Sequence, residues 1–148
     1  MQLSRFSDYA LRTLMYLACA PDGPTSVGQL SQVHGISFHH LAKTAQALAQ
    51  RGWIETRRGR TGGLRLAISP SDLTVGRVIR ELEPNLALVE CFDPAKNHCN
   101  LSPACLLKHS LSRALEAFLS ELDRVSLADL VQDRPALNRL YGIGEGAA

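Results

Sequence analysis

With 148 residues, of which 45% are hydrophobic and 20% are charged, the chain is long enough for one or two small domains and too apolar to be disordered. None of its apolar runs approaches the roughly 18 residues that a membrane helix needs, so we expect no transmembrane segment and no membrane partner. The net charge of +2 is divided unevenly along the chain. Residues 1–70 contain eight Lys or Arg and three acidic residues (+5), whereas residues 71–148 contain eight Lys or Arg and eleven acidic residues (−3). The positive charge of the first half suits it to binding a polyanion.

The first half of the chain predicts three helices in succession. A serine can cap the start of each helix, and a glycine or a proline follows its last turn. Only a short turn at Gly35 joins the second helix to the third, which is the layout of a helix-turn-helix. The three helices are expected from Ser4 or Ser7 to about Ala20, from Ser26 to Gly35, and from Ser37 to Arg51.

The third predicted helix has one apolar face and one polar face. Leu41, Ala45 and Leu48 recur on one side, and polar side chains recur on the other. A polar face alone is weak evidence, because half of any surface helix is polar. Its place directly after a short turn indicates a recognition helix for the major groove of DNA. The residues expected to meet bases and adjacent phosphates are Ser37, Phe38, His39, His40 and Lys43.

Two short strands are expected at residues 53–56 and 64–68, on either side of a segment rich in arginine and glycine. Such a hairpin is sometimes only a solvated, charged turn. Glycines that let the backbone approach DNA, together with arginines that suit phosphates or a narrow minor groove, favour a DNA contact by Arg58 and Arg60. Helices and hairpin together predict a winged-helix DNA-binding domain over residues 1–73, with double-stranded DNA as its partner.

Residues 74–148 are predicted to form a second domain, a cysteine-bearing loop with a long dimerisation helix. A helix is expected at residues 74–83, and another of about 20 residues, roughly 30 Å long, from residue 103 or 104 to about residue 124. The apolar residues of this long helix recur at near-heptad spacing, as in helices that pair with a second copy, so we expect a homodimer. Ser126 begins a last short helix. The expected fold is mainly α with a small β-hairpin wing.

Three of the four cysteines lie close together, at Cys91, Cys99 and Cys105, in a segment rich in turn-forming residues. An odd group of thiols cannot form a closed set of disulfides, whereas thiolates gathered on a loop suit zinc or an iron–sulfur cluster. The gaps of seven and five residues are too open for a zinc knuckle and workable around a larger cluster. Cys19 falls among apolar residues of the first helix and is expected in the core.

His98 and His109 lie near these cysteines and are candidates for a fourth ligand. No combination of residues typical of a hydrolase stands out, so we expect a protein that is not an enzyme. Free thiols fit a reducing compartment, which predicts a cytoplasmic location.

Five stretches of the chain, occurring together and in order, are specific to one known group of proteins. The chain resembles, almost from end to end, a family of iron–sulfur winged-helix regulators that includes nitric-oxide-sensing repressors and regulators of cluster biogenesis. The stretches that carry the resemblance are residues 1–12, 58–67, 80–84, 101–105 and 118–123. Phe38 departs from the pattern, because relatives often carry arginine at this position.

The resemblance implies a homodimer with one cluster per subunit, held by the three clustered cysteines. In members with a 4Fe–4S cluster the fourth ligand is an aspartate early in the first helix, donated by the other subunit, and Asp8 matches that position. In the cluster-biogenesis regulators it is a histidine three residues after the last cysteine, where this chain has Lys108, with His109 one place further on. The resemblance therefore favours the nitric-oxide branch, with 4Fe–4S preferred over 2Fe–2S.

The resemblance also implies a function. With the cluster intact, the dimer would bind a palindromic operator and repress transcription; nitric oxide would destroy the cluster, release the DNA and derepress genes for nitric oxide detoxification. Asp8 and Arg12 are expected to form the switch, because residues four apart on a helix can pair when the carboxylate is free. The alternatives are a cluster-biogenesis regulator, a zinc-stabilised constitutive DNA-binding protein, and an iron–sulfur electron carrier.

Overall fold

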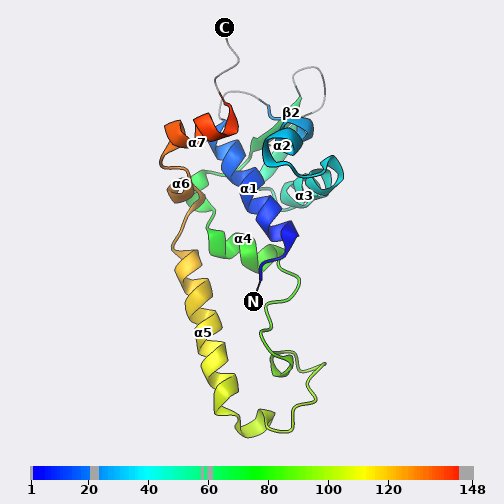
Figure 1. Ribbon diagram of the computed structural model, residues 1–148, viewed down its shortest axis with the longest axis vertical. Coiled ribbons are helices and arrows are strands. Elements are labelled where there is room, and N and C mark those ends of the chain that lie inside the picture. The colour runs from blue at the N-terminus through cyan, green and yellow to red at the C-terminus, as the bar shows by residue number, and fades with distance from the viewer. Residues whose placement is uncertain (1, 21–23, 58, 60–61, 144–148) are drawn as a thin grey trace.

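The computed structural model describes residues 2–20, 24–57, 59 and 62–143 of the chain. Figure 1 shows two parts: a head, made of residues 2–82 and 124–143, and an arm, made of residues 83–123, which extends away from it. The fold is mainly α with a two-stranded hairpin, as the sequence predicted. The elements are α1 (Arg5–Cys19), α2 (Val27–His34), α3 (Phe38–Gln50), β1 (Ile54–Arg57), β2 (Gly63–Leu66), α4 (Val75–Leu82), α5 (Leu106–Asp123), α6 (Leu127–Leu130) and α7 (Arg134–Tyr141).

Serine side chains begin the helices of the head, as expected. Ser4, and not Ser7, caps α1, because its side chain accepts a hydrogen bond from the backbone N–H of Ser7 at 3.2 Å. Ser26 and Gln29 form a reciprocal capping box at the start of α2. Gly35 follows with a left-handed φ of 63°, which turns the chain directly into α3. The predicted helix-turn-helix is confirmed.

The wing is an antiparallel hairpin in which Ile54 pairs with Leu66 and Arg57 with Gly63. The first strand, expected at residues 53–56, is found at 54–57. The second strand, expected at residues 64–68, is found at 63–66. The shift at Gly63 has a steric reason, because Thr25 bridges to Leu64 on the other side of β2 through backbone hydrogen bonds of 3.1 and 2.8 Å. A Cβ atom on Gly63 would lie 2.7 Å from Cβ of Pro24, so only glycine fits beside this bridge.

One buried cluster of apolar side chains holds the head together, and α1 lies at its centre. Leu14 of α1 packs there with residues of the helix-turn-helix and of the wing. Leu127 and Val131, which follow the arm in sequence, belong to the same cluster. The core therefore includes residues from both sides of position 73, and the division into domains at that position stays a prediction.

The stretch of residues 75–125, which contains α4 and the arm, begins and ends at one place in the head. The backbone N–H of Val75 donates to the carbonyl of Val125, and the N–H of Leu127 donates to the carbonyl of Leu73, both at 2.8 Å. Thr74 and Ser126 form a bridge between these two bonds. This short backbone pairing closes the base of the excursion formed by residues 75–125. Val75 and Ile79 of α4 then pack on the last turns of α5.

The end of the chain contains a helix that the sequence did not predict. The expected short helix is α6, which has a capping box between Ser126 and Asp129. After a break, Asp133 caps a separate helix, α7, by accepting from the N–H of Ala136 at 3.0 Å. The aromatic ring of Tyr141 lies 5.1 Å from that of Tyr16, which fixes α7 against α1. No helix among residues 2–20, 24–57 and 62–143 is both long and apolar enough to span a membrane.

Candidate DNA interface and cysteine segment

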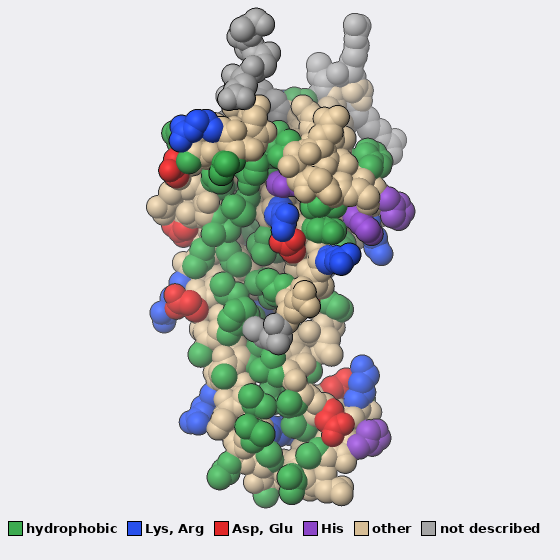
Figure 2. Space-filling model, viewed as in Figure 1, with side chains coloured by type: hydrophobic (Ala, Val, Ile, Leu, Met, Phe, Trp, Pro, Cys, Tyr) green, Lys and Arg blue, Asp and Glu red, His purple; other side chains and the backbone are tan. Residues whose placement is uncertain are grey.

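The two faces of α3 are as the sequence predicted. Leu41 and Leu48 are buried against the head, and His39, His40 and Lys43 are exposed. Phe38, at the first position of the helix, is a large apolar side chain with 60% of its surface exposed. In Figure 2, histidine and Lys or Arg side chains gather over the flank of the head that α3 occupies.

Ser37 and His40 form a closed pair at the start of α3. The Ser37 hydroxyl accepts from the backbone N–H of His40 at 3.4 Å and lies 2.9 Å from Nδ1 of its ring. That ring is 6.0 Å from the ring of Tyr9 on α1. The pair is therefore held in place by the capping bond and by α1. His39, whose ring lies 6.3 Å from that of His40, and Lys43 are on the exposed face of the helix.

The tip of the wing is only partly described. Arg58 and Arg60, the two arginines expected to contact DNA, lie outside the described residues. Next to them, the N–H of Gly62 donates to the carbonyl of Gly59 at 2.9 Å, and Gly59 has a φ of 111°, which favours glycine. Arg57 pairs with Glu55 at 3.0 Å on one face of β1.

Asp8 and Arg12 form a two-pronged ion pair on α1. Nε of Arg12 donates to one carboxylate oxygen of Asp8, and a terminal nitrogen of Arg12 lies beside the other, each at 3.0 Å. The side chains are 42% and 49% exposed, so water screens the pair and both groups are accessible. The charges of both residues also reach His34: burial lowers its pKa, Arg12 lowers it further, and Asp8 opposes that effect.

The three clustered cysteines lie on the arm. Cys91 falls in a single 3₁₀ turn, Glu90–Phe92, Cys99 lies in the following loop, and Cys105 caps α5. The long helix thus starts at Leu106, two or three residues later than expected, because Ser102–Ala104 forms a 3₁₀ turn with proline at its start. All three thiols are free and partly buried, and Cys19 is buried in the core as predicted.

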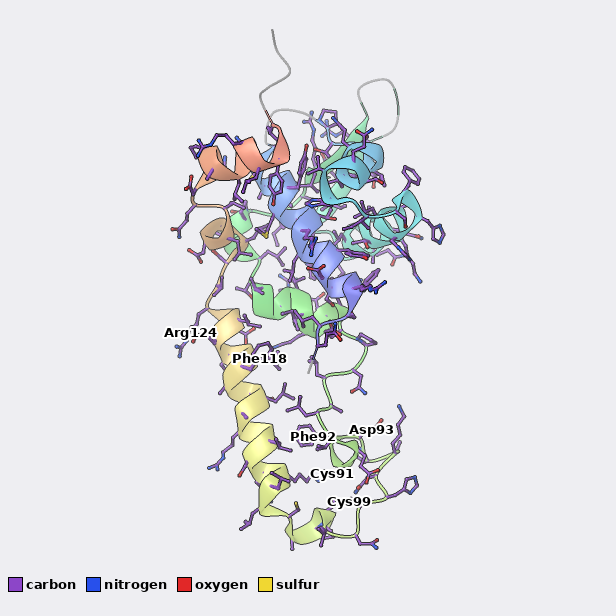
Figure 3. All side chains as sticks on the ribbon, in the orientation of Figure 1. Cys91, Phe92, Asp93, Cys99, Phe118 and Arg124 are labelled. Carbon is purple, nitrogen blue, oxygen red and sulfur yellow. The ribbon has the colours of Figure 1, made fainter. Side chains whose placement is uncertain are left out.

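The three thiols share one segment of the arm without converging on one point. In Figure 3, Cys91 and Cys99 both lie on the segment drawn beside α5. Within the part of the chain that the structure describes, no three His, Cys, Asp or Glu side chains come close enough to hold a metal ion. The described residues of one chain therefore include the three candidate thiol ligands but do not bring them together around one point.

The chemistry of these donors nevertheless fits an iron–sulfur cluster. Reduced, partly exposed thiols are the ligands that such a cluster requires. The backbone N–H of Lys108 donates to Sγ of Cys105 at 3.4 Å, as backbone N–H groups do to the sulfurs of iron–sulfur sites. Asn97 supports the loop, because its side-chain oxygen accepts from the N–H of Cys99 at 3.0 Å.

The candidate fourth ligands have different positions. Asp8 is part of α1 in the head, so within one chain it is separated from the arm segment that carries the cysteines (Figure 1). His98 lies in the loop beside Cys99, and His109 lies in the first turn of α5. Both histidines are exposed.

No sequence pattern predicted the joint between arm and head. Arg80 of α4 pairs with Asp123 at the end of α5 at 2.9 Å. A Cβ on Gly76 would collide with Asp123, whose backbone nitrogen would lie 2.7 Å away, so α4 and α5 approach closely there. At the other end of α4, the carboxylate of Glu83 accepts from the N–H of Ser4, the cap of α1, at 2.8 Å. Two of the stretches that carry the family resemblance, residues 80–84 and 118–123, meet in this joint.

The apolar stripe of α5 is buried against α4 in its second half and exposed at its start. Leu115 is buried against α4, so this part of the predicted dimer seam packs within the chain. Near the start of the helix the apolar side chains are exposed, and Figure 2 shows hydrophobic side chains across that end of the arm. The exposed residues are Leu101, Leu106 and Leu107, at 73%, 80% and 65%.

Comparison with known proteins agrees with this arrangement. Residues 3–133 match the Rrf2 family, described as an iron-dependent transcriptional regulator. The chain is 47% identical over 141 residues to the HTH-type transcriptional regulator NsrR of Geobacillus kaustophilus, covering 95% of this chain and 96% of the relative. It is 42% identical over 146 residues to NsrR of Bacillus subtilis, covering 98% and 100%.

A solved structure gives the same result for the fold. CymR, the global cysteine regulator of B. subtilis, superposes with a TM-score of 0.73 at 28% identity, over 89% of this chain and 97% of that one. These relatives are transcriptional regulators and not enzymes. The chain belongs to the Rrf2 family of transcriptional regulators, among its NsrR-type members.

Proposed function

We propose that the chain forms a homodimeric, iron–sulfur-dependent repressor that responds to nitric oxide. The observation that carries this proposal is the set of free, partly buried thiols of Cys91, Cys99 and Cys105 on one segment of an NsrR-type chain. In the cytoplasm, the loaded dimer binds a palindromic operator and represses transcription. Nitric oxide ends this binding and allows the expression of genes for nitric oxide detoxification.

The three cysteines of one subunit would hold the cluster, with Asp8 of the partner subunit as fourth ligand. When bound, the cluster supplies iron atoms that nitric oxide attacks. A carboxylate is a harder and weaker ligand for such iron than a thiolate, which would leave one iron more open to nitric oxide. The match of Asp8 to the aspartate ligand of 4Fe–4S members favours 4Fe–4S over 2Fe–2S. Donation by the partner is supported by the separation of Asp8 from the cysteines within one chain. His98 and His109 are the alternatives to Asp8.

Asp8 and Arg12 would then act as the switch. The ion pair at 3.0 Å shows that Arg12 can hold the carboxylate when Asp8 is not a ligand. Ligation would take Asp8 from Arg12 and tie α1 of one subunit to the arm of the other. Because the rings of Tyr9 and His40 lie 6.0 Å apart, a displacement of α1 would be transmitted to the recognition helix.

DNA contact would be divided between α3 and the wing. Ser37, Phe38, His39, His40 and Lys43 would lie in the major groove, and the wing arginines Arg58 and Arg60 would reach phosphates or the minor groove. A dimer would need two half-sites separated by about 34–36 Å, one turn of DNA. Operator binding should therefore require both half-sites of the palindrome.

The experiment is purification of the full chain without oxygen, with visible absorbance, iron and sulfide analysis, and operator binding before and after nitric oxide. Cys99→Ala should be colourless and should not bind the operator. Cys19→Ala is the control, and it should keep its colour. A colourless wild-type protein that contains zinc and binds the operator regardless of nitric oxide would replace the proposal by a zinc-stabilised constitutive regulator.

The fourth ligand has its own test. Asp8→Ala should lose the cluster faster than the wild type or hold it with altered absorbance, and its operator affinity should respond less to nitric oxide. A variant with unchanged spectrum and response would eliminate Asp8. The same measurements on His98→Ala and His109→Ala would then identify the ligand.

A further inference from the structure

A cavity of about 400 Å³ opens in the head, on a side of α1 that is separate from the cysteine segment. The last turns of α1, the base of the wing and the start of α7 surround it. Most of its wall is apolar, formed by side chains such as Leu17, Leu66 and Pro70. A volume of this size is in the range of small-molecule sites.

Two arginines bring positive charge to this apolar space. Arg65 of β2 and Arg134 at the start of α7 both line the cavity. Glu55 lines it too, but its carboxylate is already paired with Arg57 at 3.0 Å. Burial raises the pKa of the Cys19 thiol and Arg134 lowers it, which places the Arg134 charge near the end of α1. The excess charge at the cavity is therefore positive.

Arg65 has a donor that nothing in the described chain satisfies. Its Nε lies beneath the surface, with no hydrogen-bond partner among the described residues. A buried N–H without an acceptor is destabilising. Because Arg65 also lines the cavity, an acceptor that enters between the wing and α7 lies beside its guanidinium group.

We propose that this cavity binds a small organic carboxylate with a compact apolar body. A carboxylate matches the fork of an arginine through two parallel hydrogen bonds, and Arg65 and Arg134 offer guanidinium groups from two sides. The apolar body would lie against Leu17 and Leu66. A bound carboxylate would connect α7 to β2 and so affect how the wing is held. The site is independent of the cysteine segment and of the function proposed for it.

The test is isothermal titration of the full chain with hexanoate, with hexanol as an uncharged probe of the same length and inorganic phosphate as an anion without an apolar body. Hexanoate should bind, and both controls should bind at least about tenfold more weakly, because a charged hydrogen bond and an apolar contact each contribute about that factor. Failure of hexanoate to bind, or equal binding by phosphate, would overturn the proposal.

Substitutions then locate the site. Arg65→Met and Arg134→Met should each weaken hexanoate about tenfold or more. Arg139→Met is the matched control, because Arg139 lies on α7 outside the cavity, and it should bind as the wild type does. Arg65→Lys keeps the charge without the fork, so it should bind more weakly than wild type even if Arg65→Met does not fold. Equal affinity of Arg65→Lys and Arg134→Met to the wild type would show that hexanoate binds elsewhere.

Discussion

The head and the arm use their apolar side chains in opposite ways. In the head, large side chains such as Leu14 and Trp53 are buried in a core shared by α1, the helix-turn-helix, the wing and the final helices. In the arm, Leu106 and Leu107 are exposed and the three clustered cysteines are free thiols. The core of the head is thus complete within one chain, whereas the exposed apolar side chains of the arm belong to no such core. Stability should therefore reside in the head, and loss of an exposed apolar side chain of the arm should cost little.

The largest effect should separate the two parts directly. Leu14→Ala removes a fully buried side chain and should lower the free energy of unfolding by about 2–5 kcal/mol. Leu107→Ala, on the exposed arm, should change it by less than about 0.5 kcal/mol. Chemical denaturation of the metal-free protein at low concentration measures both. Comparable losses would show that the arm is as stably packed as the head.

The joint between the two parts should give an intermediate effect. In Gly76→Ala, the new Cβ would collide with Asp123 and force α4 from α5, at a cost of about 1–3 kcal/mol. Gly28→Ala is the matched control in α2, because its nearest neighbour is 3.7 Å away, and it should be neutral or stabilising by up to about 1 kcal/mol. Thermal unfolding of both variants would check this, and equal melting temperatures would contradict the close approach at Gly76.

Acid should weaken the head through His34. Burial lowers the pKa of this residue, as does Arg12, so the unfolded chain binds its proton more readily than the folded one. Its contribution is therefore fully present above the ordinary value of about 6.5 and is lost as the pH falls below it. In urea denaturation at pH 7.5 and pH 5.5, His34→Gln should lose less stability between the two conditions than the wild type. An identical loss would assign the acid sensitivity to other groups.

The smallest effect on stability should occur at the proposed switch. Asp8→Asn breaks an exposed ion pair, so the metal-free protein should lose no more than about 0.5 kcal/mol. Urea denaturation measures this cost, and Arg12→Gln should give a similar value. A loss above about 2 kcal/mol would mean that the ion pair stabilises the fold. Asp8 could then leave Arg12 only at a large cost in stability, which would contradict its proposed role as an exchangeable ligand.

The sequence predicted the head well because local chemistry determines it. Ser26 with Gln29, Ser37 and Gly35 fix the ends of helices within a few residues, and the structure has them as expected. The joint was not predicted, because Arg80 and Asp123 are 43 residues apart and only the folded chain brings them together. The helix α7 was missed because its eight residues make only about two turns, too few to show a clear apolar period.

The cysteines were predicted as a set from their composition and spacing alone. Their positions in space follow from neither, because they depend on the path of the whole segment between α4 and α5. The same holds for the cavity beside Arg65, whose wall comes from the first helix, the wing and the last helix. Sites assembled from distant segments lie beyond what periodicity and caps can specify.

The backbone pairing of residues 73–75 with 125–127 ties together the two ends of a stretch that contains both α4 and the arm. Within this stretch, the Arg80–Asp123 ion pair holds the last turn of α5 against α4. The other end of the arm follows α4 directly, and there the Glu83 carboxylate accepts from the N–H of Ser4, the cap of α1. A displacement of the arm is therefore expected to reach the head by two routes, through α4 at the Arg80–Asp123 contact and through α1 at the Glu83–Ser4 hydrogen bond.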